Sequence, residues 1–96
     1  MIGVFVIFRY DDNFDEQALL KTAEAAQGKF VDMPGLRSKA FTLNSEKREA
    51  INFYVWDSEE VAKAFFTEEL LERVTVLYGI RPDIEFVQMA ALVENS

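Results

Sequence analysis

Residues 51–66 read INFYVWDSEEVAKAFF. The first six of these residues are β-branched or aromatic except Asn52, which is a composition typical of a strand. Asp57 and Ser58 follow, and the side chain of either can accept a hydrogen bond from a free backbone amide at the start of a helix. Glu60 stands three residues after Asp57, which is the spacing of a capping box. The stretch therefore predicts a strand that leads directly into a helix.

Three further segments have the composition of strands, and the strand in the quoted stretch extends back to Glu49. These segments are Ile2–Tyr10, Leu36–Leu43 and Ile84–Val93. A polar turn at residues 44–48 is short enough to join the second segment to the quoted strand as a hairpin.

Two helical segments separate these strands. Asn13 begins a capping-box sequence, so the first helix is expected to start near Phe14 and to stop at the Met-Pro-Gly sequence of residues 33–35. The second helix is expected to break at Thr67, whose hydroxyl can cap a new helix, and to end at Gly79.

The predicted order of elements is β-α-β-β-α-β. This order is that of the ferredoxin-like α+β motif, a four-stranded antiparallel sheet with its helices on one face. A length of 96 residues suits one domain. We therefore expect residues 1–96 to form a single ferredoxin-like domain.

The quoted strand carries large apolar side chains on both of its faces. Ile51, Phe53 and Val55 alternate with Asn52, Tyr54 and Trp56. The helices can cover one face only, and an open apolar face would exceed the few hundred Å² of exposed apolar patch usual in monomers. Burying such a face stabilises an assembly by about 25 cal/mol per Å². We therefore expect a homodimer in which two copies of the sheet pack face to face. The face with Ile51, Phe53 and Val55 is expected to lie between the two sheets, and the face with Asn52, Tyr54 and Trp56 is expected to meet the helices.

The composition argues against several classes of partner and site. The net charge is −7, and the 10 basic residues form no stripe, so neither nucleic acid nor an anionic membrane surface is an expected partner. The chain has no Cys and no His, so we expect no transition-metal site, no haem held by histidine and no cofactor. The apolar run Ile2–Phe8 is too short to cross a membrane and lacks the basic lead of a signal peptide. A cytoplasmic protein is expected.

The sequence resembles the dimeric α/β-barrel superfamily and, within it, the small proteins similar to antibiotic-biosynthesis monooxygenases. The resemblance is carried by MPGL at residues 33–36 and by YVWDSEE at residues 54–60, and it spans nearly the whole chain in element order. It implies a barrel formed between two subunits. It also implies oxidation of an electron-rich aromatic substrate by O₂ without metal or flavin, in which the anion of the substrate reduces the oxygen.

The same resemblance implies two catalytic residues, Asn52 and Trp56, which stand four residues apart on the quoted strand. Many similar proteins also carry a His on the second helix, where this chain has Phe65 and Phe66. The residues themselves leave another interpretation open. Asn52 can be a structural amide bonded to backbone, and Trp56 can be a packing anchor at the end of a strand.

Five residues are candidates for substrate binding: Arg9, Tyr54, Phe65, Phe66 and Tyr78. Arg9 could bind an anionic group or pair with Asp11 or Asp12, and either tyrosine could orient a polar ligand or simply pack in the core. Two functions remain open. One is oxygenation of a small aromatic or hydrophobic substrate in a pocket between sheet and helices, and the other is a non-catalytic binding or structural role on the same scaffold.

Overall fold

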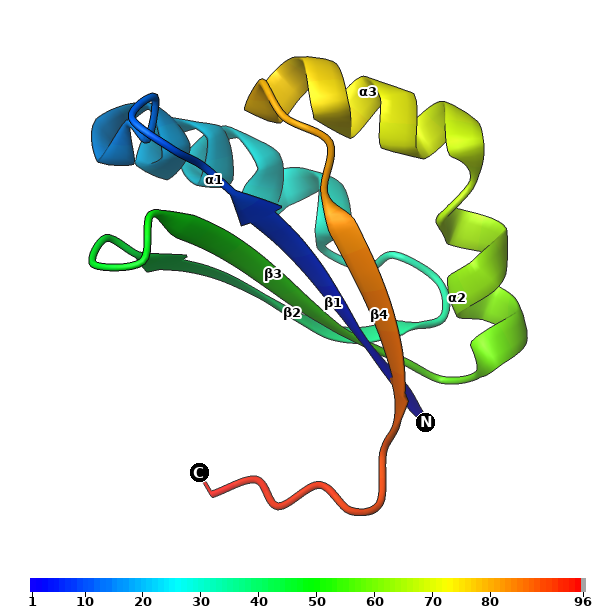
Figure 1. The fold of residues 1–96 in the computed structure, drawn as a ribbon. Coiled ribbons are helices and arrows are strands. Elements are labelled where there is room, and N and C mark those ends of the chain that lie inside the picture. Colours follow the sequence, from blue (N-terminus) through cyan, green and yellow to red (C-terminus); the bar gives the residue numbers. More distant parts are fainter. Residues whose placement is uncertain (96) are drawn as a thin grey trace.

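The structure is a computed structural model, and it describes residues 1–95. The elements are, in order, β1 (Ile2–Arg9), α1 (Glu16–Phe30), β2 (Leu36–Asn44), β3 (Glu49–Trp56), α2 (Glu59–Phe65), α3 (Glu68–Tyr78) and β4 (Asp83–Gln88). The strands form one antiparallel sheet in the order β2-β3-β1-β4, and the helices lie on one face of it (Figure 1). The predicted ferredoxin-like fold is confirmed. No helix within residues 1–95 combines the length and apolar character needed to cross a membrane.

The core lies between the sheet and the helices. β1 pairs with β3 so that Val4 lies opposite Tyr54 and Val6 lies opposite Asn52, and the side chains of these residues point toward the helices. Trp56 joins them in the core and is 1% exposed. The predicted face of the quoted strand that meets the helices is therefore confirmed.

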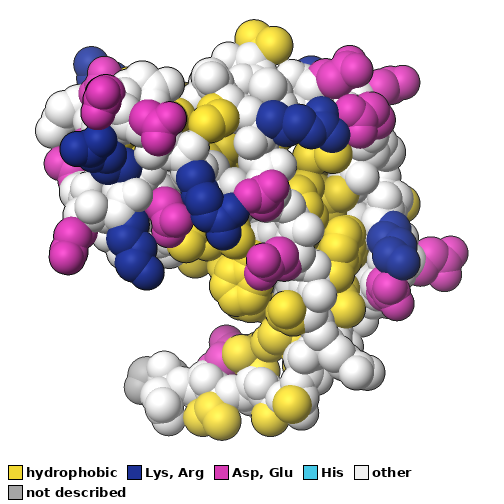
Figure 2. Space-filling view, in the orientation of Figure 1, with side chains coloured by type: hydrophobic (Ala, Val, Ile, Leu, Met, Phe, Trp, Pro, Cys, Tyr) yellow, Lys and Arg dark blue, Asp and Glu magenta, His cyan; other side chains and the backbone are white. Residues whose placement is uncertain are grey.

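The opposite face of the sheet is apolar and has no helix over it (Figure 1). The rings of Phe5 and Phe53 lie 4.6 Å apart there, and both side chains stay half-buried. A Cβ atom on Gly3 would lie 3.0 Å from atoms of Phe53 and Val87, so the missing side chain makes room for this cluster. Figure 2 shows hydrophobic side chains in the middle of the view and again on the C-terminal segment below, with charged side chains both between and around them.

The start of α1 differs from the prediction. The carboxylate of Asp15 accepts a hydrogen bond from the backbone N–H of Ala18 at 3.1 Å, so Asp15 is the N-cap and the helix begins at Glu16. The side chain of Asn13, the predicted cap, instead accepts a hydrogen bond from the backbone N–H of Asp11 at 3.2 Å. Asn and Asp are equally good caps, and local sequence spacing did not distinguish between them.

β4 is shorter than predicted, because it ends at Gln88 and not at Val93. It is an edge strand that pairs only with β1, and Gln88 lies opposite Ile2, where β1 begins. The backbone N–H of Met89 still donates a hydrogen bond of 3.4 Å to the carbonyl of Met1, and residues 90–95 then turn away from the sheet (Figure 1).

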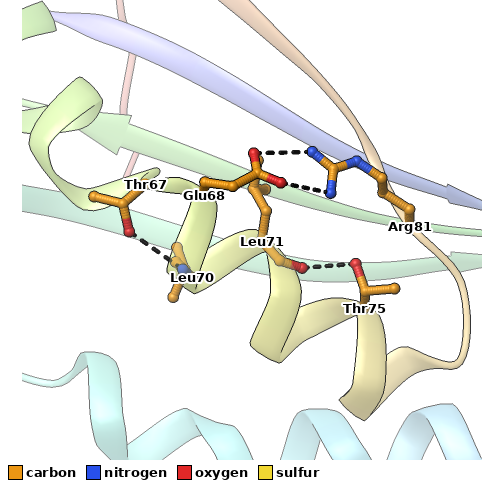
Figure 3. Close-up of polar contacts among 6 residues, drawn as sticks. All are labelled: Thr67, Glu68, Leu70, Leu71, Thr75 and Arg81. Atoms are coloured by element: carbon orange, nitrogen blue, oxygen red, sulfur yellow. Dashed lines mark hydrogen bonds and ion pairs between the residues drawn. The ribbon is translucent and has the colours of Figure 1, made fainter.

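The predicted break at Thr67 is confirmed, and polar contacts hold α3 in place (Figure 3). The hydroxyl of Thr67 accepts a hydrogen bond from the backbone N–H of Leu70 at 3.2 Å. The guanidinium of Arg81 donates two hydrogen bonds, of 3.0 and 3.1 Å, to the carboxylate of Glu68. The hydroxyl of Thr75 donates at 2.6 Å to a backbone carbonyl one turn earlier, which accommodates this β-branched residue within the helix.

Candidate functional site

A cavity of about 280 Å³ lies between the sheet and the helices. Its walls come from all four strands and all three helices described above, and most of the lining side chains are apolar or aromatic. Five of the predicted site residues line it: Asn52, Tyr54, Phe65, Phe66 and Tyr78. A largely apolar enclosure with a few convergent polar groups is the usual form of a small-molecule site.

The polar centre of the cavity is a pair formed by Asn52 and Tyr78. Asn52 is 4% exposed, and its side-chain N–H₂ donates a hydrogen bond to the Tyr78 hydroxyl at 3.1 Å. Burial raises the pKa of Tyr78, although the hydrogen bond from Asn52 opposes the rise. The Tyr78 hydroxyl therefore stays protonated at neutral pH, and because it accepts from Asn52, its own hydrogen can point to a ligand oxygen.

Two further contacts hold Tyr78 in position. Its ring stacks on that of Phe8, with centroids 3.9 Å apart and planes 9° from parallel. Its backbone carbonyl accepts a hydrogen bond of 2.6 Å from the hydroxyl of Tyr10. These contacts restrict the ring, so the hydroxyl is already placed before any ligand arrives.

An aromatic wall closes one side of the cavity. The rings of Tyr54 and Phe66 lie 5.0 Å apart, and those of Phe65 and Phe66 lie 4.9 Å apart, and both pairs meet edge to face. Burial raises the pKa of the Tyr54 hydroxyl, so this group too is neutral in the physiological range. The wall offers flat ring faces and edges to an aromatic guest.

Trp56 does not line the cavity. Its ring stacks behind Tyr54, with centroids 5.9 Å apart and planes 9° from parallel, and it lies 5.0 Å from Phe65. The indole Nε1 is buried without a hydrogen-bond partner in the described residues. Four residues of extended chain span roughly 13 Å, so Asn52 and Trp56 share a face of β3 without meeting.

Arg9 lies apart from the cavity. It ends β1 on the opposite face of the sheet and forms ion pairs with Asp83 and, at 3.4 Å, with Glu49. The sequence suggested Asp11 or Asp12 as its partner, but Glu49 is the residue directly opposite Arg9 across the β1–β3 ladder. The structure therefore does not bring Arg9 together with the other predicted residues.

Lys39 lines the cavity but was not among the predicted site residues. It lies opposite Tyr54 on β2, and its Nζ lies 3.4, 4.2 and 4.4 Å from the ring centroids of Phe30, Phe41 and Tyr54. Burial lowers the pKa of Lys39 to about 7, while the ring faces attract the protonated form. The site thus contains an amine that can change its charge near neutral pH.

A β-bulge places Lys39 on this face. The ladder shifts register between Leu36 and Ser38, so that both Leu36 and Lys39 face the helices. The sequence contains a signal of this, because Leu36 and Phe41 are both large apolar residues of opposite parity. Without a bulge the two could not face the same side of the sheet.

No protein-family model matches the sequence, and no curated protein is similar enough in sequence to match it. Solved structures do share the fold. A monooxygenase from the gene ActVA-Orf6 of Streptomyces coelicolor, in complex with nanaomycin D, has a TM-score of 0.70 at 19% identity, covering 99% of this chain and 92% of that one. A protein of unknown function from Nitrosomonas europaea has a TM-score of 0.74 at 16% identity, with 99% and 94% covered.

A "putative antibiotic biosynthesis monooxygenase" from Deinococcus radiodurans has a TM-score of 0.64 at 10% identity, covering 100% of this chain and 99% of the other. These likenesses concern the fold. The chain has the fold of the dimeric α/β-barrel proteins that include antibiotic-biosynthesis monooxygenases, and the resemblance noted in the sequence is confirmed at that level.

Proposed function

We propose that this protein binds a small, flat, largely apolar molecule in the cavity between sheet and helices and oxidises it with O₂ without a cofactor. The observation that carries the proposal is the buried Asn52–Tyr78 pair, which places hydrogen-bonding groups inside an aromatic enclosure. The fold shared with a monooxygenase that was solved with the ligand nanaomycin D supports it.

In the proposed reaction, the substrate itself supplies the electrons that reduce O₂. A hydroquinone reacts with O₂ to give a hydroxyquinone and water, so one oxygen atom enters the product and the other leaves as water. The hydroxyl of Tyr78 and the amide of Asn52 hold the substrate oxygen on which negative charge develops before electron transfer. Trp56 supports the site indirectly, because it packs behind the Tyr54 ring.

Oxygen consumption with a panel of hydroquinones and polyphenols tests the proposal, and isotopically labelled O₂ separates oxygen insertion from simple autoxidation. Asn52→Ala and Tyr78→Phe are each expected to slow turnover roughly 30- to 1000-fold, which corresponds to the loss of one hydrogen bond to a developing anion. Lys47→Gln, on the exposed hairpin turn, is the matched control and should keep the wild-type rate. Full activity in Asn52→Ala would place the chemistry elsewhere.

Non-catalytic binding is the second candidate function. It is favoured by the position of Trp56, since only one of the two residues implied as catalytic reaches the cavity. In that case aromatic molecules bind to the wild type while oxygen consumption stays at the uncatalysed rate with every substrate of the panel.

We also infer that two copies associate through the uncovered face of the sheet. Phe5, Phe53 and Val87 cluster there without a helix above them. The C-terminal segment carries the exposed side chains of Leu92 and Val93, which are 41% and 82% exposed. Burial of both surfaces in a homodimer removes them from water.

A further inference from the structure

The charged residues that line the cavity are all cations. Lys29, Lys39 and Arg73 contribute to its walls, and no carboxylate of residues 1–95 does. The chain as a whole carries 17 acidic against 10 basic residues, so a lining drawn from its average composition would be acidic. The cavity therefore has a local charge opposite in sign to that of the protein.

These three cations have no partner within the described part of the chain. Lys29, Lys39 and Arg73 lie within ion-pair distance of no carboxylate there, whereas five other basic residues do form ion pairs. The paired residues are Arg9, Arg37, Arg48, Lys63 and Arg81. Water can solvate the charges of Lys29 and Arg73, which are exposed, but Lys39 is half-buried. A partly buried charge without a counter-charge is costly, and it becomes favourable when a ligand supplies the opposite charge.

Lys39 is the cation best placed to meet a ligand. Its Nζ lies among the rings of Phe30, Phe41 and Tyr54, which are the groups that an aromatic ligand would also contact. Lys39 lies directly across from Tyr54, so Asn52 is its diagonal neighbour on the same face, with Cα atoms roughly 7–8 Å apart. A single aromatic molecule can therefore reach the amine and the Asn52–Tyr78 pair at once.

We infer that the cavity selects an aromatic acid, a molecule with a flat apolar body and one carboxylate, and that Lys39 binds the carboxylate as an ion pair. This inference rests on the proposed function of the cavity and narrows its ligand class. A carboxylate is favoured over a phenol because it is already anionic at neutral pH. In a phenolic acid, the carboxylate lies at Lys39 and the phenolic oxygen lies at Asn52 and Tyr78.

Binding of such an anion is coupled to protonation of Lys39. The amine has a pKa of about 7 in the free protein, and a bound carboxylate favours its charged form, so binding above that pH takes up a proton. The other groups around Lys39 are the cations Lys29 and Arg73 in the cavity, and Glu24, Asp32 and Arg37 in the adjoining groove. Affinity for a carboxylate is therefore expected to fall as pH rises above about 7, by at most tenfold per pH unit.

Calorimetric titration with naphthoate and with naphthamide provides the test, because the two probes have the same ring system and differ in charge. At about pH 6 the wild type should bind naphthoate about 10- to 100-fold more tightly than naphthamide, the range expected for a hydrogen bond to a charged group. Lys39→Met should lose this preference while keeping its affinity for naphthamide. Lys21→Met, which removes an exposed cation outside this cavity, should bind both probes as the wild type does.

The possible outcomes test the preference for an acid separately from the proposed binding function. Equal binding of the two probes by the wild type overturns the preference for an acid and leaves the cavity a site for neutral ligands. Binding of neither probe overturns the proposed binding function as well. A preference retained in Lys39→Met assigns the anion to Lys29 or Arg73 and refutes the role of Lys39. If Lys39→Met does not fold, Lys39→Gln replaces it, and the fall in wild-type naphthoate affinity between about pH 6 and about pH 9 tests the role of the amine without any variant.

Discussion

A partly buried lysine is a feature that a protein maintains at a cost in stability. Lys39 lies against three aromatic rings, and its burial favours the uncharged amine. Lysine side chains are usually exposed, and those with lowered pKa values are frequent at functional sites. The stability of this protein is therefore expected to depend on pH through Lys39.

The sign of that dependence follows from the two pKa values. In the folded protein the pKa of Lys39 is about 7, against an ordinary value of 10.5, so between these values the unfolded chain binds one more proton than the folded protein. The free energy of unfolding of the wild type should therefore rise with pH across this range relative to that of Lys39→Met. Urea denaturation of both proteins at several pH values measures the difference.

Comparing the wild type with Lys39→Met cancels the contributions that other titrating groups make to the pH dependence of stability. Burial raises the pKa of Tyr10 to about 12 and raises that of Tyr54 as well, but both tyrosines are present in both proteins and their contributions largely cancel. A stability difference that stays constant between about pH 7 and about pH 10 would show that the Lys39 amine is charged and solvated in the folded state.

The hydrogen bond between Asn52 and Tyr78 should be detectable as an energetic coupling. In a double-mutant cycle of Asn52→Ala and Tyr78→Phe, the coupling free energy is expected to be about 0.5–1.5 kcal/mol, the usual net contribution of one such bond. The control cycle pairs Asn52→Ala with Thr22→Ala, whose hydroxyl bonds to Ala18 within α1, and it should be additive. Additivity in both cycles would mean that the bond contributes nothing to stability.

The lead into β2 depends on contact with α2. Gly35 has a φ of +83°, and a Cβ atom at this position would collide with the side chain of Val61 on α2. Its carbonyl also accepts a hydrogen bond of 2.9 Å from the backbone N–H of Asp57, just before that helix. α1 already ends at Phe30, before the predicted stop at the Met-Pro-Gly sequence, and this sequence instead positions β2 against the start of α2.

Two glycine substitutions separate two effects on stability: the cost of a left-handed backbone conformation and the gain from a higher helix propensity. Gly35→Ala should destabilise the protein by at least about 1–2 kcal/mol from the left-handed backbone, with a further cost of overpacking against Val61. Gly28→Ala is the matched control, because Gly28 lies inside α1 with open space around its Cα, and it should stabilise by roughly 0.5–1 kcal/mol. Thermal or urea unfolding measures both, and an unharmed Gly35→Ala would mean that the lead into β2 is free to move.

In the proposed homodimer, the partner copy covers a whole face of the sheet. Light scattering should give the mass of a dimer at micromolar concentration. Phe53→Asp places a carboxylate in the cluster with Phe5 and Val87 and should dissociate the dimer, because burying an unpaired charge costs several kcal/mol. Circular dichroism distinguishes a folded monomer from an unfolded chain.

Val76→Asp is the control for this prediction. Val76 lies on α3 on the other side of the sheet and is already 85% exposed, so a charge there should leave the dimer intact. A dimeric and equally stable Phe53→Asp protein would mean that the copies meet elsewhere or that the wild type is a monomer.

The features that the sequence determined are those set by near neighbours along the chain. The alternation around Phe53 predicted which face of β3 meets the helices, and Thr67 predicted the break between α2 and α3; both are confirmed. Strand alternation and helix capping depend on residues within a few positions of each other, so they can be predicted without knowledge of the fold. Local sequence did not predict that Asp15, and not Asn13, caps α1, or where β4 ends.

The composition of the candidate site was decided by the tertiary structure. Asn52, Tyr54, Phe65, Phe66 and Tyr78 were all predicted, but only packing showed that Trp56 lies behind the wall and that Arg9 lies on the far face of the sheet. Lys39 reaches the cavity because one bulge in β2 shifts the register, and a one-residue shift exchanges the two faces of a strand. Its lowered pKa then arises from rings on α1, β2 and β3 together, an environment that exists only after distant segments have packed.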